Sequence, residues 1–131
     1  MNETIKVFIV DDSKMGQAML AKMLTDLGPN VKIVGEASTA SGAIFMLEDD
    51  LPDMVMLKLN IPGDIGSEDA LRQIKEVDPN IYIVVCPMPQ DREDLDGFIR
   101  SGKADNFLAK PIKKPVLERL VTAFYQRRAS Q

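Results

Sequence analysis

Residues 7–13 read Val7-Phe8-Ile9-Val10-Asp11-Asp12-Ser13, an apolar run that stops abruptly at two acids. The apolar residues from Ile5 to Val10 predict a strand. Ser13 or Asp12 can cap a following helix, and apolar residues recur at helical spacing as far as Leu27. Gly28-Pro29-Asn30 then ends that pattern. This part of the chain therefore predicts a strand that leads directly into a helix.

The rest of the chain repeats this alternation. Strands are predicted at 31–34, 54–57, 81–85 and 106–109, and helices at 40–47, 68–77, 91–100 and from Pro115, which suits a first helical turn. The nearly continuous apolar run at 54–57 is typical of a parallel strand covered on both faces. We therefore expect an α/β fold with a five-stranded, doubly wound parallel sheet of the flavodoxin-like (βα)5 type. Ligands of such sheets lie beyond the carboxyl ends of the strands.

Length and composition limit the possible functions. The chain has 131 residues, a net charge of −4, one cysteine and no histidine. This length suits a single domain over residues 1–131, with a polar tail at about 126–131. No apolar run approaches the ~20 residues that cross a bilayer, and no secretory signal is present, so we expect a cytoplasmic protein without a membrane partner. The acidic balance disfavours nonspecific nucleic-acid binding.

Polar residues gather where the predicted strands end. Asp11 and Asp12 follow the first strand, Lys58 and Asn60 the third, Cys86 the fourth and Lys110 the fifth. On the expected fold these loops converge at one edge of the sheet. Adjacent carboxylates repel, so a divalent metal or an ammonium is expected beside them. A lone Asp-Asp pair is more often a helix cap, but its coincidence with the other strand-end residues favours a site.

Several segments together resemble the receiver domains of two-component response regulators, which are CheY-like proteins. The resemblance covers about the whole chain. It is carried by residues 7–13, Pro52-Asp53, Asn60-Ile61-Pro62-Gly63 and Asn106-Phe107-Leu108-Ala109-Lys110-Pro111. In that family an acidic pair and a strand-three aspartate hold Mg²⁺. The aspartate takes a phosphoryl group from a histidine kinase, and a Thr or Ser and a Lys contact the phosphate.

The resemblance assigns roles to five residues of this chain. Asp11 and Asp12 match the acidic pair, and Asn60 matches the residue whose backbone carbonyl binds the metal. Lys110 matches the phosphate-contacting lysine, with a bond to Pro111 that resembles the family's cis peptide. Phe107 falls at the aromatic switch position. The chain also has one apparent extra residue between Pro62 and Leu71, beside the pocket.

Two positions depart from the family pattern: Lys58 stands at the phosphoacceptor position and Cys86 at the Thr or Ser position. An acylphosphate requires a carboxylate, so we expect no phosphorylation at Lys58. A lysine here also places positive charge where Mg²⁺ would bind, so we expect no cofactor, weak or absent Mg²⁺ binding, and only vestigial metal positions. We expect Lys58 to pair with Asp11 or Asp12; in the alternative its ammonium reaches solvent.

Cys86 and Phe107 each have a structural interpretation and a functional one. Cys86 is interpreted as a small residue filling the threonine site, and the alternative is a redox-sensing thiol whose pKa is lowered by Lys58 and Lys110. Phe107 is interpreted as a core or half-buried strand residue. In the family an aromatic residue at this position changes rotamer on phosphorylation, so the resemblance implies that Phe107 is fixed in one state here.

We therefore expect a pseudo-receiver that acts through protein contacts and has no catalytic residue. The resemblance implies that signalling partners bind at about 91–128, although a charged helix face is more often simply solvated. Besides Lys110 of the pocket, the cations of this region are Arg92, Arg100, Lys103, Lys113, Lys114, Arg119, Arg127 and Arg128. One alternative function is a conventional phospho-accepting regulator in which Lys58 is engineered or bypassed. A flavodoxin-like ligand-binding protein or enzyme is disfavoured, because Asp11-Asp12 would repel a phosphate after the first strand. The oligomeric state is open.

Overall fold

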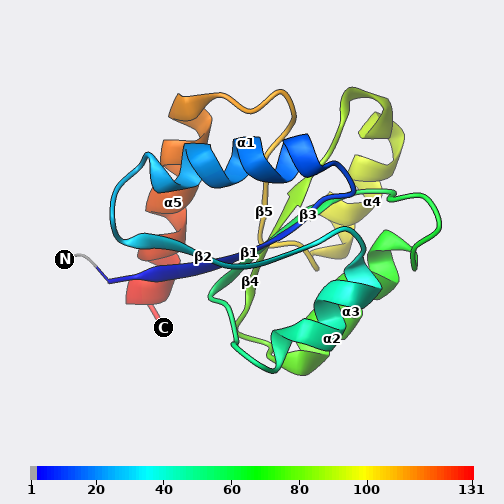
Figure 1. The fold of residues 1–131 in the computed structure, drawn as a ribbon. Helices are drawn as coiled ribbons and strands as arrows, with labels where there is room; N and C mark the ends of the chain where they lie inside the picture. Colours follow the sequence, from blue (N-terminus) through cyan, green and yellow to red (C-terminus); the bar gives the residue numbers. More distant parts are fainter. Residues whose placement is uncertain (1–2) are drawn as a thin grey trace.

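The structure is a computed structural model that describes residues 3–131, the side chains of 92–94 excepted. Its core is one five-stranded sheet in the order β2-β1-β3-β4-β5 (Figure 1). The strands are β1 (Ile5–Val10), β2 (Val31–Ala37), β3 (Met54–Lys58), β4 (Tyr82–Cys86) and β5 (Asn106–Phe107), and every pairing is parallel. The expected doubly wound α/β fold is confirmed.

Five helices connect and cover the strands. They are α1 (Lys14–Thr25), α2 (Ala40–Leu47), α3 (Ser67–Val77), α4 (Arg92–Ser101) and α5 (Lys114–Ala129), with a 3₁₀ turn at Pro89–Asp91. Helices α1 and α5 lie on one face of the sheet, and α2 and α3 lie side by side on the other (Figure 1). Among the described residues, no helix is long and apolar enough to cross a membrane.

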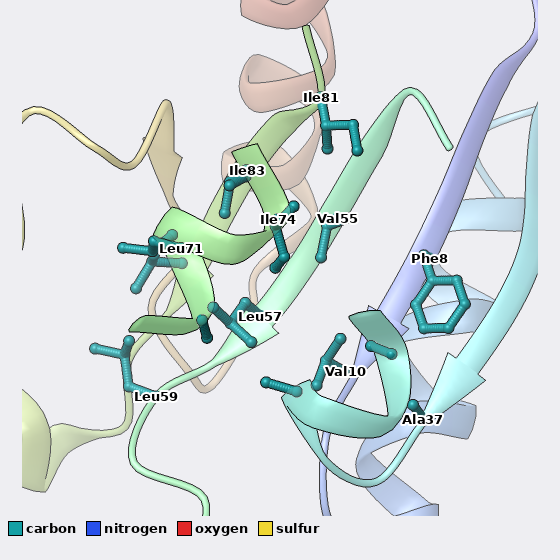
Figure 2. Packing of buried hydrophobic residues seen from close by; sticks show 14 of the residues in the cluster. Phe8, Val10, Ala37, Val55, Leu57, Leu59, Leu71, Ile74, Ile81 and Ile83 are labelled. Carbon is teal, nitrogen blue, oxygen red and sulfur yellow. The ribbon is translucent and has the colours of Figure 1, made fainter. Parts of the chain in front are cut away.

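Successive side chains of each strand point to opposite faces of the sheet, so the core forms two layers. Figure 2 shows the layer beneath α2 and α3, where Phe8 and Val10 of β1 and Val55 and Leu57 of β3 point toward the helices. The intervening residues of β1, Ile5, Val7 and Ile9, pack on the other face with α1 and α5. Each such side chain stabilises the fold by about 1.5–3 kcal/mol when fully buried. This two-sided burial explains why the strands are almost uninterrupted runs of apolar residues.

Strand β3 runs one residue further than predicted, to Lys58, and two strands differ from the prediction by more than one residue. Strand β2 continues through Ala37 rather than ending at Val34, and a register shift between Val7 and Phe8 accommodates the extension. Gly35 makes this possible, because a Cβ at Gly35 would lie 2.4 Å from the Phe8 ring. Strand β5 ends at Phe107 rather than at Ala109, since the chain then turns toward the cis peptide bond between Lys110 and Pro111.

The residues expected to form a polar tail, at about 126–131, are helical as far as Ala129. Arg128 Nη2 lies 2.7 Å from Asp53 Oδ1, and its guanidinium lies over the Phe124 ring. Arg127 Nη2 similarly donates to Asp105 Oδ1 at 2.9 Å. These partners are 22 to 75 residues away in the sequence, so the polar composition of the last turns gave no sign of the anchoring.

Asp64, in the loop that follows β3, caps the amino terminus of α2. Its carboxylate accepts hydrogen bonds from the backbone N–H groups of Ala40 and Ser41 and from Ser41 Oγ at 3.1 Å. Burial raises the pKa of Asp64, but the hydrogen bonds from Ala40, Ile65 and Ser41 outweigh it, so the pKa lies below its ordinary value of 3.8. The loop with the apparent extra residue therefore holds α2 in place.

We expect Asp64→Ala to lower the free energy of unfolding at pH 7 by about 1–2 kcal/mol, because α2 loses a cap and an acid at its positive end. The folded-state pKa is lowered, so this contribution is present above pH 3.8 and is lost as the pH falls through the folded-state pKa. Denaturant unfolding at several pH values measures the difference. Asp49→Ala, at the opposite end of α2, is the control and should cause no loss; equal losses in both variants would contradict the assignment.

Candidate functional site

The carboxyl ends of β1, β3, β4 and β5 bring the predicted site residues to one edge of the sheet. Asp11 and Asp12 follow β1, Lys58 is the last residue of β3, and Lys110 follows β5. Lys58 pairs in register with Cys86 at the end of β4. Lys58 follows Leu57, so strand alternation turns its side chain away from the α2–α3 layer. The four charged side chains meet there although the chain separates them by up to 99 residues.

Lys58 forms an ion pair with Asp12, as we predicted, and does not extend into solvent as in the alternative arrangement. Its Nζ donates to Asp12 Oδ1 at 2.7 Å and lies 3.9 Å from Asp11 Oδ1. The hydrogen bond from Lys58 lowers the pKa of Asp12, and the hydrogen bond to Asp12 raises the pKa of Lys58. The Lys58 side chain is 19% exposed, so its ammonium is held in the pocket rather than released to solvent.

Asp11 has an ammonium of its own. Its side chain is only 2% exposed and forms an ion pair with Lys110 through Oδ2, while Oδ1 accepts a hydrogen bond from the Ser13 backbone N–H at 2.9 Å. Each of the two adjacent carboxylates is therefore matched by one lysine. The repulsion between Asp11 and Asp12 is relieved by these two cations.

These residues do not fit the Mg²⁺ ion that the receiver resemblance implies. Mg²⁺ needs carboxylate and other oxygen ligands in near-ideal octahedral geometry. Here the Lys58 ammonium lies against Asp12 and close to Asp11, and Lys110 binds the remaining oxygen of Asp11. Within residues 3–131, the side chains of 92–94 aside, no group of three or more His, Cys, Asp or Glu side chains could hold a metal ion.

The first turn of α1 shapes the floor of the site, which sequence reasoning did not foresee. Ser13 caps α1 by accepting a hydrogen bond from the Gly16 N–H at 3.0 Å. A Cβ on Gly16 would lie 2.6 Å from Asp11 Oδ2, so only glycine lets the helix approach the carboxylate this closely. Gln17, which is buried, donates from Nε2 to the Asp11 carbonyl at 2.7 Å. In the sequence, the one available sign of this close contact was a glycine so early in a predicted helix.

Asn60 and Asp91 join two loops beside the pocket. Asn60 has a left-handed backbone with φ of 57°, and its Nδ2 donates to Asp91 Oδ1 at 2.9 Å. Asp91 is only 5% exposed and also accepts from the Met88 N–H at 2.8 Å. Sequence reasoning placed Asp91 only at the start of a helix, because an acid there resembles an ordinary cap. Its burial and its link to Asn60 depend on the three-dimensional arrangement.

Cys86 and Phe107 lie where their structural interpretations, rather than their functional ones, placed them. Cys86 is 2% exposed and packs in the layer beneath α1 and α5. Burial raises the pKa of its thiol to about 12, and the attraction of Lys110 is the smaller effect. The geometry therefore removes the physical basis of a reactive thiol. Phe107 is half-buried against the opposite layer, and the bond from Lys110 to Pro111 is cis, as the resemblance implied.

We expect Gly16→Ala to destabilise the protein by up to about 2 kcal/mol. Alanine would favour a helix by about 1 kcal/mol, but displacing the buried Asp11 carboxylate costs about 1–3 kcal/mol. Gly97→Ala is the matched control, because nothing lies within 4 Å of a Cβ on this glycine of α4, and it should stabilise by about 0.5–1 kcal/mol. Denaturant unfolding measures both variants; a gain in Gly16→Ala would show that Asp11 adapts freely.

We expect Cys86 in the folded protein to react with a thiol reagent at pH 8 at least about a hundredfold more slowly than in denaturant, because its thiol is buried and little ionised. The time course of labelling, followed by mass, measures this ratio. Equal rates under the two conditions would restore the redox interpretation.

Comparison with known proteins gives the family. The family described as "Response regulator receiver domain" matches residues 7–122. Over 108 residues the chain is 30% identical to chemotaxis protein CheY of Thermotoga maritima, covering 82% of this chain and 87% of that protein. It is 31% identical over 110 residues to chemotaxis protein CheY of Halobacterium salinarum, covering 84% and 88%. The solved REC domain of AraT from Geobacillus stearothermophilus matches with a TM-score of 0.84 at 20% identity, covering 97% of each chain. The chain therefore belongs to the response regulator receiver domain family of two-component signalling.

Proposed function

We propose that this receiver domain works without phosphorylation, as a pseudo-receiver that signals through protein contacts alone. The observation that carries the proposal is the Lys58–Asp12 ion pair at the carboxyl end of β3, with 2.7 Å between Nζ and Oδ1. We place Lys58 at the position where the family carries its phosphate-accepting aspartate. An ammonium cannot form an acylphosphate, and here it also fills the space beside both acids.

The carboxylates nearest the pocket are all engaged, which disfavours a substitute acceptor. Asp12 and Asp11 are bound by Lys58 and Lys110. Asp91 is buried and hydrogen-bonded to Asn60, and Asp64 caps α2. A nucleophilic carboxylate would have to leave these partners, and separating one member of a partly buried pair leaves an uncompensated charge. The alternative of a conventional receiver that bypasses Lys58 is therefore the weaker one.

Lys58 acts in this proposal as an internal counter-ion. It supplies from the chain itself the positive charge that the acidic pair needs, and unlike a metal or a phosphoryl group it cannot be exchanged. The pocket would then stay in one electrostatic state, and the partner surface would not be switched through it. In this proposal the protein has no catalytic activity, lies in the cytoplasm and does not need Mg²⁺.

The partner surface in this proposal is the cationic side of α4 and α5, within about 91–128. The cations exposed there are Arg100, Lys103, Lys113, Lys114, Arg119 and Arg127. Two of the expected cations are engaged elsewhere, since Arg127 pairs with Asp105 and Arg128 with Asp53. The Arg92 side chain lies outside the described residues. An acidic surface on a signalling protein is the complement that such a face would attract.

Intact mass after incubation with Mg²⁺ and acetyl phosphate tests the proposal. We expect the unaltered chain to gain no phosphoryl group and Lys58→Asp to gain one, because the variant restores a carboxylate nucleophile between Asp12 and Lys110. Lys58→Asn is the matched control: it removes the ammonium without adding a nucleophile, so it should stay unmodified.

Phosphorylation of the unaltered chain would contradict the proposal, and mapping the modified residue would then identify a conventional receiver with another acceptor. Failure of Lys58→Asp to react, with its fold intact by circular dichroism, would show that Lys58 does not stand at the acceptor position.

A further inference from the structure

The outward face of α2 carries the most exposed large apolar side chain among the described residues. Helix α2 buries Ala40, Ala43 and Leu47 against the sheet. Phe45 lies between these positions on the opposite side of the helix and is 86% exposed. Met46 and Leu51 beside it are also exposed, at 41% and 43%. A phenylalanine this exposed contributes little burial to folding, and its ring is open to contact with another molecule.

Three acidic residues come directly after α2 in the sequence. Glu48, Asp49 and Asp50 are exposed and lie at the carboxyl end of α2, whose last turn has no basic residue. That end of a helix carries partial negative charge, so three acids there repel it. Asp50 pairs with Lys6 at 2.5 Å. Within the described chain, neither Glu48 nor Asp49 has an ion-pair partner. Lys32, which is exposed on the edge strand β2, pairs with neither of them.

We propose that this face docks a cationic, amphipathic segment of another protein. The α2 patch consists of Phe45, Met46, Glu48, Asp49 and Leu51. Glu48, the C-cap of α2, lies three residues beyond Phe45 and so shares its face, and Asp49 follows in the turn after the helix. The apolar side of the docked segment covers Phe45, and its lysines or arginines meet the two acids. An arginine can also stack on the exposed ring of Phe45.

The charges of the α2 patch exclude other occupants. Anionic lipid surfaces and nucleic acids would meet Glu48 and Asp49 with like charge. A symmetric dimer through this face would place the acids of one copy against those of the other, because such an interface uses the same surface twice. A protein segment that combines basic and apolar residues satisfies both parts of the patch.

The α2 patch lies at the opposite end of the sheet from Lys58. Leu51 comes shortly before Met54, the first residue of β3, whereas Lys58 is the last. Binding here therefore does not require any change at the Lys58 pocket, and the inference stands whether or not the chain is phosphorylated. The acidic α2 patch and the cationic face of α4 and α5 have opposite charge, so one chain can bind two different proteins at once.

The test is a titration of the isotope-labelled protein with a synthetic helical peptide of leucine and lysine, followed by NMR. We expect saturable shifts centred on residues 41–51. A peptide in which glutamate replaces every lysine should cause none there, because its charge is of the wrong sign. Shifts centred elsewhere, or equal shifts with both peptides, would overturn the inference.

Two variants locate the apolar contact. Phe45→Ser should weaken binding of the lysine peptide about tenfold, as expected for an apolar anchor at the centre of a contact. Met19→Ser is the matched control, because Met19 on α1 is another exposed apolar residue, at 60%, and it should leave the affinity unchanged. Thermal unfolding checks that both variants keep their fold. An equal effect of the two substitutions would overturn the inference.

Two further measurements address the excluded occupants. Sedimentation velocity of the unaltered chain should show no self-association that Phe45→Ser removes. Co-sedimentation with vesicles containing phosphatidylserine should show no binding that depends on Phe45. A positive result in either experiment would assign the face to a second copy or to a membrane and overturn the proposal.

Discussion

The two lysine–carboxylate pairs at the carboxyl edge of the sheet are the interaction on which the site depends. Asp11 follows the buried strand β1, and its side chain is almost completely enclosed, so it needs a cation within contact distance. Lys110 supplies that cation to Asp11, and Lys58 supplies one to Asp12. The arrangement is only possible because parallel strands end at the same edge and bring β1, β3 and β5 together. Removing one lysine would leave an acid in the pocket without its counter-ion.

A pocket neutralised from within changes what a receiver fold can do. The family resemblance implies a site whose charge changes when metal and phosphate bind. In this chain the same edge holds two acids and two ammonium groups, and Gly16 brings α1 against one of the acids. Such a site is suited to holding one arrangement of its loops. In the function proposed above, any regulation would come from binding at surfaces.

Long-range polar contacts add to local capping at the ends of several elements. The last turns of helix α5 are held by Arg127 and Arg128, which pair with acids just before β5 and β3. Helix α2 begins where Asp64, from a distant loop, accepts its N–H groups. Asp105 receives both Lys75 and Arg127 and so joins α3, β5 and α5. The surface of this small domain is therefore ordered by ion pairs that link elements far apart in the chain.

The sequence by itself determined the order of the strands and helices, the parallel sheet, and the edge at which the charged residues meet, because periodic burial leaves a direct mark on residue order. It also indicated that Lys58 faces the acidic pair. It left open which aspartate Lys58 binds, whether Cys86 is reactive, and where the last helix ends. Only the tertiary structure decided these points and revealed Asp91, Gly16 and the exposed Phe45. Apart from the contact of Gly16 with nearby Asp11, these points depend on the packing of elements that the chain separates widely, and local sequence carries no record of it.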